Sequence, residues 1–423
     1  MQQDTPRGVR DFPPADAISL KYIAGVAEEV FKRFGFYPLE TPAIENLSVL
    51  NAKAYGNETT KEIYKIDGEE TALRYDFTVP LARFVASNKD LMLPFKRYQI
   101  GSIWRRDEPQ KMRYREFMQA DIDIVGSSET ESDAEVVAAS ALVLEELGVR
   151  NYVVLLNSRQ LLQQVLDYFK VPAAKHEGVL RVMDKLQKLS RAEALAQIIS
   201  LGLDQKTSEG ILAFVEQQAG NAEKLQNVSA NVEGAKESVE KMQELLSLLA
   251  EYKLAGKFVV DLSLARGLDY YTGFIWEFVI EENGKRLPSI GSGGRYDNLI
   301  GLYSKKAIPA TGSSLGISRI FDLMEQKDGK KTYANAFVAW IGTQNRGYAI
   351  NVANTMRGNG IYVDMNASSK NLSKQMEYAS SLGIRRVIII GDKEREAGKV
   401  KVRNMDSGEE ELISLQEAIE KVR

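Results

Sequence analysis

The hydrophobic pattern of this 423-residue chain changes its period along the sequence, and these changes limit the folds it can adopt. Between residues 73 and 125 apolar and polar residues alternate, which indicates antiparallel strands. From 172 to 255 the apolar residues recur at helical spacing with no clear strand. After a polar linker at 326–332, strand-like and helix-like stretches alternate, as is typical of a small α/β domain with a largely parallel sheet. Because the chain also exceeds what one hydrophobic core usually organises, we expect two or three domains.

Capping and turn residues predict where individual helices begin and end. Asp16 is a candidate N-cap for a helix that Gly35 stops, and Ser132 with Glu135 forms a capping-box pattern before a helix that Gly148 ends. The remaining expected elements are strands at 36–40, 152–156, 257–264, 274–280, 336–341, 361–364 and 386–390, with helices at 349–357 and 372–382.

Two of the alternating stretches have a polar face. In 73–78, Arg74, Asp76 and Thr78 share one side of the predicted strand. In 115–125 the side opposite Met118, Ala120, Ile122 and Ile124 is formed by Arg115, Phe117, Gln119, Asp121 and Asp123. A sheet face with this many polar groups beside one aromatic ring is either solvated or the floor of a polar site.

Composition excludes several kinds of catalytic site. The chain has no cysteine, which rules out disulfides, thiolate zinc sites and cysteine nucleophiles. Its single histidine, His176, lies in a polar helical stretch and is expected to be a solvated surface residue, so catalysis has to depend on arginines, carboxylates, amides and hydroxyls. The 55 Lys and Arg residues are balanced by 58 Asp and Glu residues, so any RNA contact must use local patches. With neither a signal-peptide core nor a long apolar run, we expect a cytoplasmic protein without membrane contact.

Three segments resemble those of one enzyme family. Residues 96–109 (Lys-Arg-Tyr-Gln-Ile-Gly-Ser-Ile-Trp-Arg-Arg-Asp-Glu-Pro) with 113–117 look like motif 2 of class II aminoacyl-tRNA synthetases. Residues 266–273 (Arg-Gly-Leu-Asp-Tyr-Tyr-Thr-Gly) resemble the segment peculiar to histidyl-tRNA synthetases, and 312–319 (Gly-Ser-Ser-Leu-Gly-Ile-Ser-Arg) resembles motif 3. Supporting similarities occur at 5–11, around Pro42, at 74–78 and at 291–297. The chain thus resembles a class II synthetase of the histidyl type.

This resemblance implies an α+β catalytic domain at 1–325, an antiparallel sheet flanked by helices, with a helical insertion at 172–255. An α/β anticodon-binding domain follows at 333–423. The implied reaction activates histidine with ATP to histidyl-adenylate and transfers histidine to the 3′ end of tRNA(His). Mg²⁺ is expected with ATP, and no protein side chain is assigned as its ligand. Motif 1 near Pro42 forms a subunit interface in this class, which implies a homodimer.

The resemblance gives ATP-binding roles to the arginines of motifs 2 and 3. Arg105 would hold the α-phosphate and the histidine carboxylate, Arg113 the outer phosphates, and Arg319 the nucleotide from motif 3, while adenine would stack on Phe117. A permanent charge and a planar fork of donors suit arginine to these tasks. The family usually has an acid where Ser318 stands, so this chain departs from the common form at that position. Arg266 is expected across the α-phosphate from Arg105, as a second catalytic group that also belongs to the histidine site.

Histidine recognition needs acceptors for the ammonium group and partners for the imidazole nitrogens. The resemblance assigns the ammonium and carboxylate to Asp76, Thr78 and Gln119, and it assigns an imidazole N–H to Asp123. The opposing hydroxyl and the wall of the pocket are assigned to Tyr270, Tyr271 and Tyr296.

Two alternatives remain open at this point. The synthetase-like regulatory subunit of ATP phosphoribosyltransferase has the catalytic fold but is a non-catalytic binding protein. The arginines of motifs 2 and 3 and the C-terminal α/β domain favour the enzyme over this subunit. A class II synthetase for another small amino acid is the second alternative, and the 266–273 segment speaks against it.

Overall fold

The computed structural model describes residues 3–52, 63–186, 189–265, 270–282, 285–324, 330–365 and 371–423. The chain divides into two compact units, Met1–Asp11 with Tyr22–Glu325, and Phe12–Lys21 with Gln326–Arg423. Helix α1 (Pro14–Arg33) contains residues of both units. Within the described ranges, none of the helices combines the length and the apolarity that crossing a bilayer requires.

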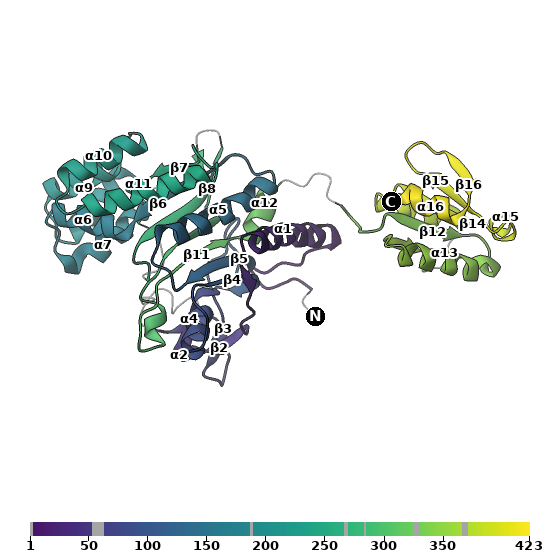
Figure 1. Ribbon diagram of the computed structural model, residues 1–423, viewed down its shortest axis with the longest axis horizontal. Coiled ribbons are helices and arrows are strands. Elements are labelled where there is room, and N and C mark those ends of the chain that lie inside the picture. The colour runs from purple at the N-terminus through teal and green to yellow at the C-terminus, as the bar shows by residue number, and fades with distance from the viewer. Residues whose placement is uncertain are drawn as a thin grey trace. The chain divides into compact units, whose positions relative to one another are not determined.

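The first unit is built on a large, mainly antiparallel sheet, as the alternating pattern predicts (Figure 1). Within the described residues it has nine strands, in the order β1-β4-β5-β11-β10-β8-β6-β7, with β9 paired to β8. Only the two edge pairings along this order, β1 with β4 and β6 with β7, are parallel. The strands are β1 (Tyr37–Pro38), β4 (Phe95–Trp104), β5 (Glu116–Val125), β6 (Tyr152–Ser158), β7 (Phe258–Val260), β8 (Phe274–Glu282), β9 (Lys285–Arg286), β10 (Gly291–Arg295) and β11 (Ala310–Leu315).

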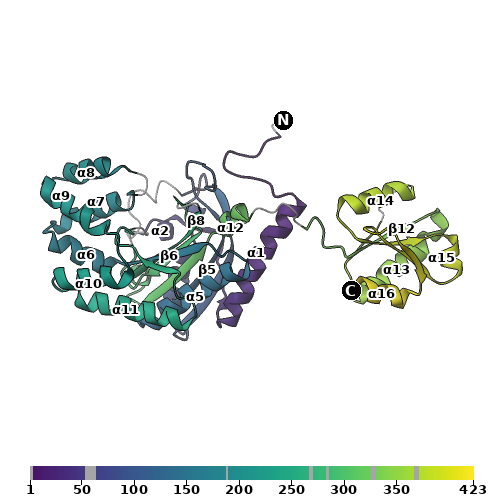
Figure 2. The ribbon, with the colours of Figure 1, turned by 90° about the horizontal axis from the view of Figure 1, so that it is seen from above.

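Helices cover this sheet and extend from its β6–β7 end. Helix α5 (Thr130–Glu146) packs on β11 and β5, and α12 (Ile317–Leu323) packs on β5. Figures 1 and 2 show the helices that follow β6 gathered beyond this end of the sheet. They are α6 (Arg159–Tyr168), α7 (Ala173–Met183), α8 (Arg191–Ser200), α9 (Gln205–Val215), α10 (Asn221–Asn231) and α11 (Lys236–Glu251). The predicted helical character of 172–255 is therefore confirmed.

The strand predicted through Thr78 is wrong, because a helix begins there. Strand β3 (Thr71–Leu73), which pairs with β2 (Ile44–Asn46), ends before Arg74, and α4 runs over Thr78–Ser87. The Asp76 carboxylate accepts a hydrogen bond from the Val79 amide at 3.1 Å, which satisfies a donor of the first helical turn. Pro80 fits in that turn, where a missing N–H costs nothing. The stretch is buried on all sides, so its alternation did not indicate a strand.

Several predicted boundaries also differ. Helix α1 starts at Pro14, with Asp16 inside its first turn, and α5 starts at Thr130, so Ser132 is no cap; its hydroxyl donates to Ser127 Oγ at 2.7 Å. Gly35 and Gly148 end their helices with φ of 76° and 77°, as predicted. His176 is also less solvated than expected, with 13% side-chain exposure and Nε2 2.9 Å from the Val171 carbonyl oxygen.

The second unit is a smaller α/β structure whose sheet is only partly parallel. Its order is β13-β12-β14-β15-β16, with β12 parallel to both β13 and β14, and the other pairings antiparallel. Helices α13 and α16 lie on one face and α14 on the other (Figure 2). The predicted strands at 336–341, 361–364 and 386–390 are confirmed, but the final hairpin was not predicted. The elements are β12 (Ala336–Trp340), α13 (Arg346–Gly358), β13 (Val363–Met365), α14 (Leu372–Ser381), β14 (Arg386–Ile390), α15 (Asp392–Glu396), β15 (Val400–Asn404), β16 (Glu410–Ile413) and α16 (Leu415–Val422).

Candidate active site

A cavity of about 360 Å³ opens over the central strands β5, β11, β10 and β8 of the first unit. Arg266 lies outside the described residues. The other residues predicted for the site all line this one cavity: Asp76, Thr78, Arg105, Arg113, Phe117, Gln119, Asp123, Tyr270, Tyr271, Tyr296 and Arg319. The polar face of β5 is therefore the floor of a polar site rather than a solvated surface.

The acidic part of the cavity is centred on Asp123, which is held by two buried partners. Arg97 is directly opposite on β4, and its NH2 lies 2.6 Å from Asp123 Oδ2. The Tyr296 hydroxyl donates a short hydrogen bond to Asp123 Oδ1. Arg97 is fully buried, and burial raises the pKa of Asp123 while Arg97 opposes this rise. Asp123 thus positions Tyr296 as well as facing the cavity.

Glycines form the wall beside these acids because side chains would not fit there. A Cβ at Gly312 would overlap the Asp123 carboxylate, and at Gly294, which adjoins the lining Gly293, a Cβ would lie 2.8 Å from the ring of Tyr271. At Gly293 a Cβ would overlap the Gly312 carbonyl oxygen and crowd the Trp276 indole. Backbone rather than side chains therefore lines this side of the cavity.

Asp76 and a group of tyrosines close the cavity near the start of α4. One carboxylate oxygen of Asp76 accepts from the Val79 amide, and burial raises the Asp76 pKa to about 6. The Tyr270 ring packs edge-on against Tyr271 and Tyr296, with centroid distances of 4.8 Å and 5.6 Å. Burial raises the pKa of all three tyrosines, so their hydroxyls stay protonated and able to donate.

The arginines lie at the other end of the same strands. Phe117 and Asp123 are six residues apart on β5, which corresponds to about 20 Å along a strand. Arg105, directly after β4, donates from Nε to the Tyr75 carbonyl at 3.0 Å, and its guanidinium is 5.4 Å from the centre of the Phe117 ring. The cavity therefore has a cationic end near Phe117 and an acidic end near Asp123, and Asp76 interacts electrostatically with Arg105.

The two other predicted arginines are also held in place. Arg113 forms a fork with Asp107, with N–O distances of 2.8 Å and 2.9 Å. Arg319 donates to the carbonyl oxygens of Met112 at 3.0 Å and Ser289 at 2.7 Å. Fixed guanidinium groups lose little freedom when an anion binds, which favours a phosphate-binding role.

Ser318, where the family usually has an acid, has a structural contact. Its side chain is buried, and its hydroxyl oxygen accepts a hydrogen bond from the Met118 amide at 3.0 Å. This contact joins α12 to β5 between Phe117 and Gln119. A serine at this position therefore ties α12 to the cavity-lining strand β5.

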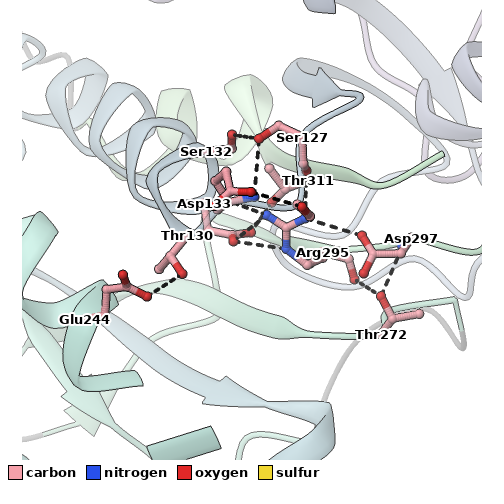
Figure 3. A network of polar contacts seen from close by, with 11 residues as sticks. Ser127, Thr130, Ser132, Asp133, Glu244, Thr272, Arg295, Asp297 and Thr311 are labelled. Atoms are coloured by element: carbon pink, nitrogen blue, oxygen red, sulfur yellow. Dashed lines mark hydrogen bonds and ion pairs between the residues drawn. The ribbon is translucent and has the colours of Figure 1, made fainter. Parts of the chain in front are cut away.

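A buried network behind the cavity was not predicted from the sequence (Figure 3). Arg295, next to Tyr296, donates to Asp133 Oδ2 from Nε at 3.0 Å and from NH2 at 2.6 Å. Thr311 donates to Asp133 Oδ1 at 2.6 Å, and Arg295 also donates to the carbonyl oxygens of Ser127 and Glu129. The network joins α5, β10 and β11, and so fixes the strand from which Tyr296 reaches Asp123.

Asp121 also lines the cavity and received no role from the sequence. Its side chain is buried, and Oδ1 has no hydrogen-bond partner among the described residues. Burial raises its pKa to about 7, with Arg97 opposing the rise and Asp123 adding to it. The alternation along β5 already placed Asp121 and Asp123 on the polar face, but it did not show that each has one carboxylate oxygen without a hydrogen-bond partner among the described residues.

Comparisons with known proteins agree on the family. Residues 8–320 match the histidyl-tRNA synthetase family, and residues 335–423 match the anticodon binding domain. A histidine–tRNA ligase of Aeropyrum pernix is 39% identical, with 99% of this chain and 97% of that protein covered. One from Korarchaeum cryptofilum is 36% identical, covering 99% and 98%. The crystal structure of histidyl-tRNA synthetase from Nostoc sp. PCC 7120 superposes with a TM-score of 0.87 at 28% identity, covering 100% and 99%. The chain belongs to the histidyl-tRNA synthetase family of class II aminoacyl-tRNA synthetases, the histidine–tRNA ligases, and carries their C-terminal anticodon-binding domain.

Proposed function

We propose that the cavity of the first unit joins histidine to ATP as histidyl-adenylate, and that the chain then transfers histidine to the 3′ end of tRNA(His). The observation that supports this is the division of one cavity into a cationic end and an acidic end. Activation brings two anions together, because a histidine carboxylate oxygen attacks the α-phosphorus while pyrophosphate leaves. Fixed cations are needed where this charge develops, and acceptors are needed where the amino acid presents its donors.

The arginines act on the phosphates in this proposal. Arg105 holds the α-phosphate and the histidine carboxylate, and Arg113 and Arg319 hold the nucleotide, whose adenine stacks on Phe117. Arg266, by resemblance, approaches the α-phosphate from the other side. Mg²⁺ supplies further charge neutralisation when bound, and it prefers phosphate oxygens and water as ligands.

The acidic end recognises histidine. Asp76, Thr78 and Gln119 bind the ammonium and carboxylate groups, and Asp123 accepts from the imidazole. Tyr270, Tyr271 and Tyr296 supply hydroxyls and the wall. Each buried acceptor that an analogue leaves unpaired costs about 1–3 kcal/mol, so a polar floor can select histidine over amino acids of similar size.

ATP–pyrophosphate exchange with each amino acid in turn tests this function. Histidine alone is expected to support exchange, and subsequent addition of tRNA(His) is expected to yield charged tRNA. If none of the amino acids supported exchange, the result would favour the non-catalytic regulatory subunit over the enzyme. If a different amino acid supported exchange, the proposed specificity for histidine would be wrong.

Replacing Asp123 tests its role in histidine binding. Alanine would leave fully buried Arg97 without any acceptor and open a cavity, so Asp123→Asn, which keeps the shape and one acceptor oxygen, is the better variant. We expect the KM for histidine to rise about tenfold or more, because the neutral asparagine amide cannot offer the imidazole N–H the negative charge of the Asp123 carboxylate. The KM for ATP, measured in the same exchange assay, should change by less than about twofold. Small and equal changes in both constants would assign this contact to another acid.

The second unit is proposed to bind the anticodon, with the catalytic domain at 1–325 and the anticodon domain at 333–423. A chain ending at Met324 is therefore expected to retain histidine-dependent exchange while losing most aminoacylation. The cavity-lining residues all precede this point, so adenylate formation does not need the second unit. Exchange and charging are compared on the same preparation, with circular dichroism as the control for folding. If the shortened chain charged tRNA as well as the full-length protein, the proposal that the second unit binds the anticodon would be wrong.

A homodimer and a cytoplasmic location complete the proposal. Motif 1 lies around Pro42, and near it Tyr37 and Ile44 have exposed fractions of 68% and 52%. Large apolar side chains exposed near one edge of a sheet support a subunit interface there. Sedimentation equilibrium is expected to give twice the mass of the chain.

A further inference from the structure

Residues 5–11 belong to the family resemblance, yet none of these described residues lines the cavity. They lie instead against the turn that joins β4 to β5. The Gly8 carbonyl oxygen accepts a hydrogen bond from the Arg115 amide at 2.8 Å. Gly8 has a φ of 84°, and a Cβ there would lie 2.7 Å from Pro109 Cγ, so the close contact requires glycine. The N-terminal segment is thus packed on the turn that carries Arg113.

Arg10 connects this segment to motif 2 and to α12 at once. Its NH1 donates to the Tyr114 hydroxyl at 2.9 Å and to Asp322 Oδ1 at 2.8 Å. The Tyr114 hydroxyl donates in turn to Asp322 Oδ2 at 2.9 Å. Burial and this hydrogen bond raise the pKa of Tyr114, so the hydroxyl keeps the proton that it donates. The Arg10 guanidinium also lies 4.1 Å from the centre of the Tyr114 ring, so each of the three side chains contacts the other two.

Arg113 stands between two residues that are both attached to α12. On one side Tyr114 bonds to Asp322, and on the other the Met112 carbonyl oxygen accepts from Arg319 Nε at 3.0 Å. Arg319 and Asp322 are three residues apart and therefore neighbours on this helix. Met112 is buried and has a φ of 62°, a left-handed conformation that persists only where the surroundings hold it. The backbone on each side of Arg113 is therefore held in place.

We propose that Arg10, Tyr114 and Asp322 are positioning residues for ATP binding. Together they form an N-terminal latch, outside the cavity, that holds Arg113 where it meets the outer phosphates. This inference rests on the proposed role of Arg113, and it adds residues 5–11 to the parts of the chain that serve the nucleotide. A guanidinium group that is already oriented loses less freedom when a phosphate binds. Loss of the N-terminal latch should therefore weaken binding of the outer phosphates, and not of adenosine or histidine.

The first experiment measures nucleotide binding without turnover. The full-length protein is titrated calorimetrically with ATP and with AMP, which lacks the outer phosphates, each in the presence of Mg²⁺. In Arg10→Ala we expect the Kd for ATP to rise about 3- to 10-fold and the Kd for AMP to change by less than about twofold, because only ATP reaches Arg113. A smaller rise for ATP, or equal rises for both nucleotides, would overturn the proposal.

A double-mutant cycle tests whether Arg10 acts through Arg113. Arg113→Ala removes the group that the N-terminal latch is proposed to orient. In that background the further cost of Arg10→Ala on the Kd for ATP should fall below about twofold, because residues that act through a shared group are not additive. A cost above that limit would show that Arg10 acts by another route, and the proposal would be wrong.

Arg286→Ala is a matched control for the loss of an ion pair. Arg286 NH1 lies 2.8 Å from Asp261 Oδ2, the same distance as in the Arg10–Asp322 pair. The side chains are 32% and 13% exposed, against 27% and 13% for Arg10 and Asp322, and neither Arg286 nor Asp261 lines the cavity. Arg286→Ala should bind both nucleotides like the wild type. If it weakened ATP binding as much as Arg10→Ala does, general loosening of the unit would explain the effect and the proposal would fall.

Tyr114→Phe is the milder variant, in case Arg10→Ala folds poorly. It keeps the ring and removes only the hydroxyl that joins Arg10 to Asp322. We expect the Kd for ATP to rise about two- to fivefold and the Kd for AMP to stay at the wild-type value, since one partly buried hydrogen bond is lost. Unchanged binding of ATP in this variant would remove Tyr114 from the N-terminal latch and overturn the proposal.

ATP–pyrophosphate exchange separates this inference from the proposed function. Arg10→Ala should raise the KM for ATP and for pyrophosphate about 3- to 10-fold and leave the KM for histidine within about twofold of the wild type. An equal rise in the histidine KM would overturn the proposal. If the wild type catalysed no exchange with histidine while Arg10→Ala still weakened ATP binding selectively, the proposed function would be wrong and the N-terminal latch would stand.

Discussion

Arg105→Ala is expected to slow the single-turnover formation of histidyl-adenylate by about 10²- to 10³-fold, the usual cost of removing one preorganised donor at a reacting centre. The Tyr75 carbonyl fixes the Arg105 Nε, so the guanidinium is already oriented before substrates bind. Its contribution should be largest in the transition state, where negative charge accumulates on the α-phosphate. Rapid-quench measurement of adenylate at saturating ATP and histidine tests this, and histidine affinity should change much less.

Two further variants refine this expectation. Arg105→Lys should recover only part of the lost rate, because an ammonium group lacks the planar fork of donors. Arg266→Ala should slow the same step to a similar extent, since the family resemblance places Arg266 across the α-phosphate from Arg105. If the adenylate rate stayed at the wild-type value and only transfer to tRNA slowed, these arginines would have to be reassigned to the second step.

Asp133→Ala is expected to lower the free energy of unfolding by about 3–5 kcal/mol, because it leaves Arg295 as an uncompensated buried charge. The Arg295 side chain is 8% exposed and Asp133 is 1% exposed, so water cannot replace the lost carboxylate. Thr311 also loses its acceptor. Urea denaturation followed by circular dichroism measures the change. Because Arg295 is next to Tyr296, the surviving folded protein should also bind histidine less tightly.

A nearby acid provides the control for this prediction. Asp297 also pairs with Arg295, at 3.3 Å, but its side chain is 38% exposed. Asp297→Ala should therefore cost less than about 1 kcal/mol, since exposed ion pairs are screened by solvent. Equal losses in the two variants would show that burial of the Arg295 pair is not the source of the stability.

The sequence predicted the elements whose pattern depends on local periodicity. The strand at 115–125 and the helices of 172–255 were found because each has a simple repeat over many residues. The strand predicted through Thr78 was wrong because this segment is buried on all sides. In such a segment the order of polar and apolar residues does not indicate which face points to solvent. The β15–β16 hairpin was missed because its strands are short and four of their nine residues are charged. Local patterns could not show either effect of tertiary context.

The site residues were predicted mainly by motif resemblance, and the cavity gathers those that the structure describes. The side chains that interact with these site residues could not be predicted from the sequence. Arg97 and Asp123 are 26 residues apart, and Asp133 and Arg295 are 162 apart, so only the folded sheet shows that they pair. Asp121 could be placed on the right face by alternation, but its unpaired oxygen depends on how three strands come together.

The glycine wall of the cavity also limits how this enzyme can be altered. Larger substrates are commonly admitted to a pocket by shortening the side chains that line it. At Gly293 and Gly312 there is no side chain left to shorten, and any addition collides with Trp276 or Asp123. Substitutions on this wall can therefore make the pocket smaller but never wider. An engineered enzyme for bulkier histidine analogues would have to gain its space from the tyrosine side, where Tyr271 and Tyr296 offer volume that can be removed.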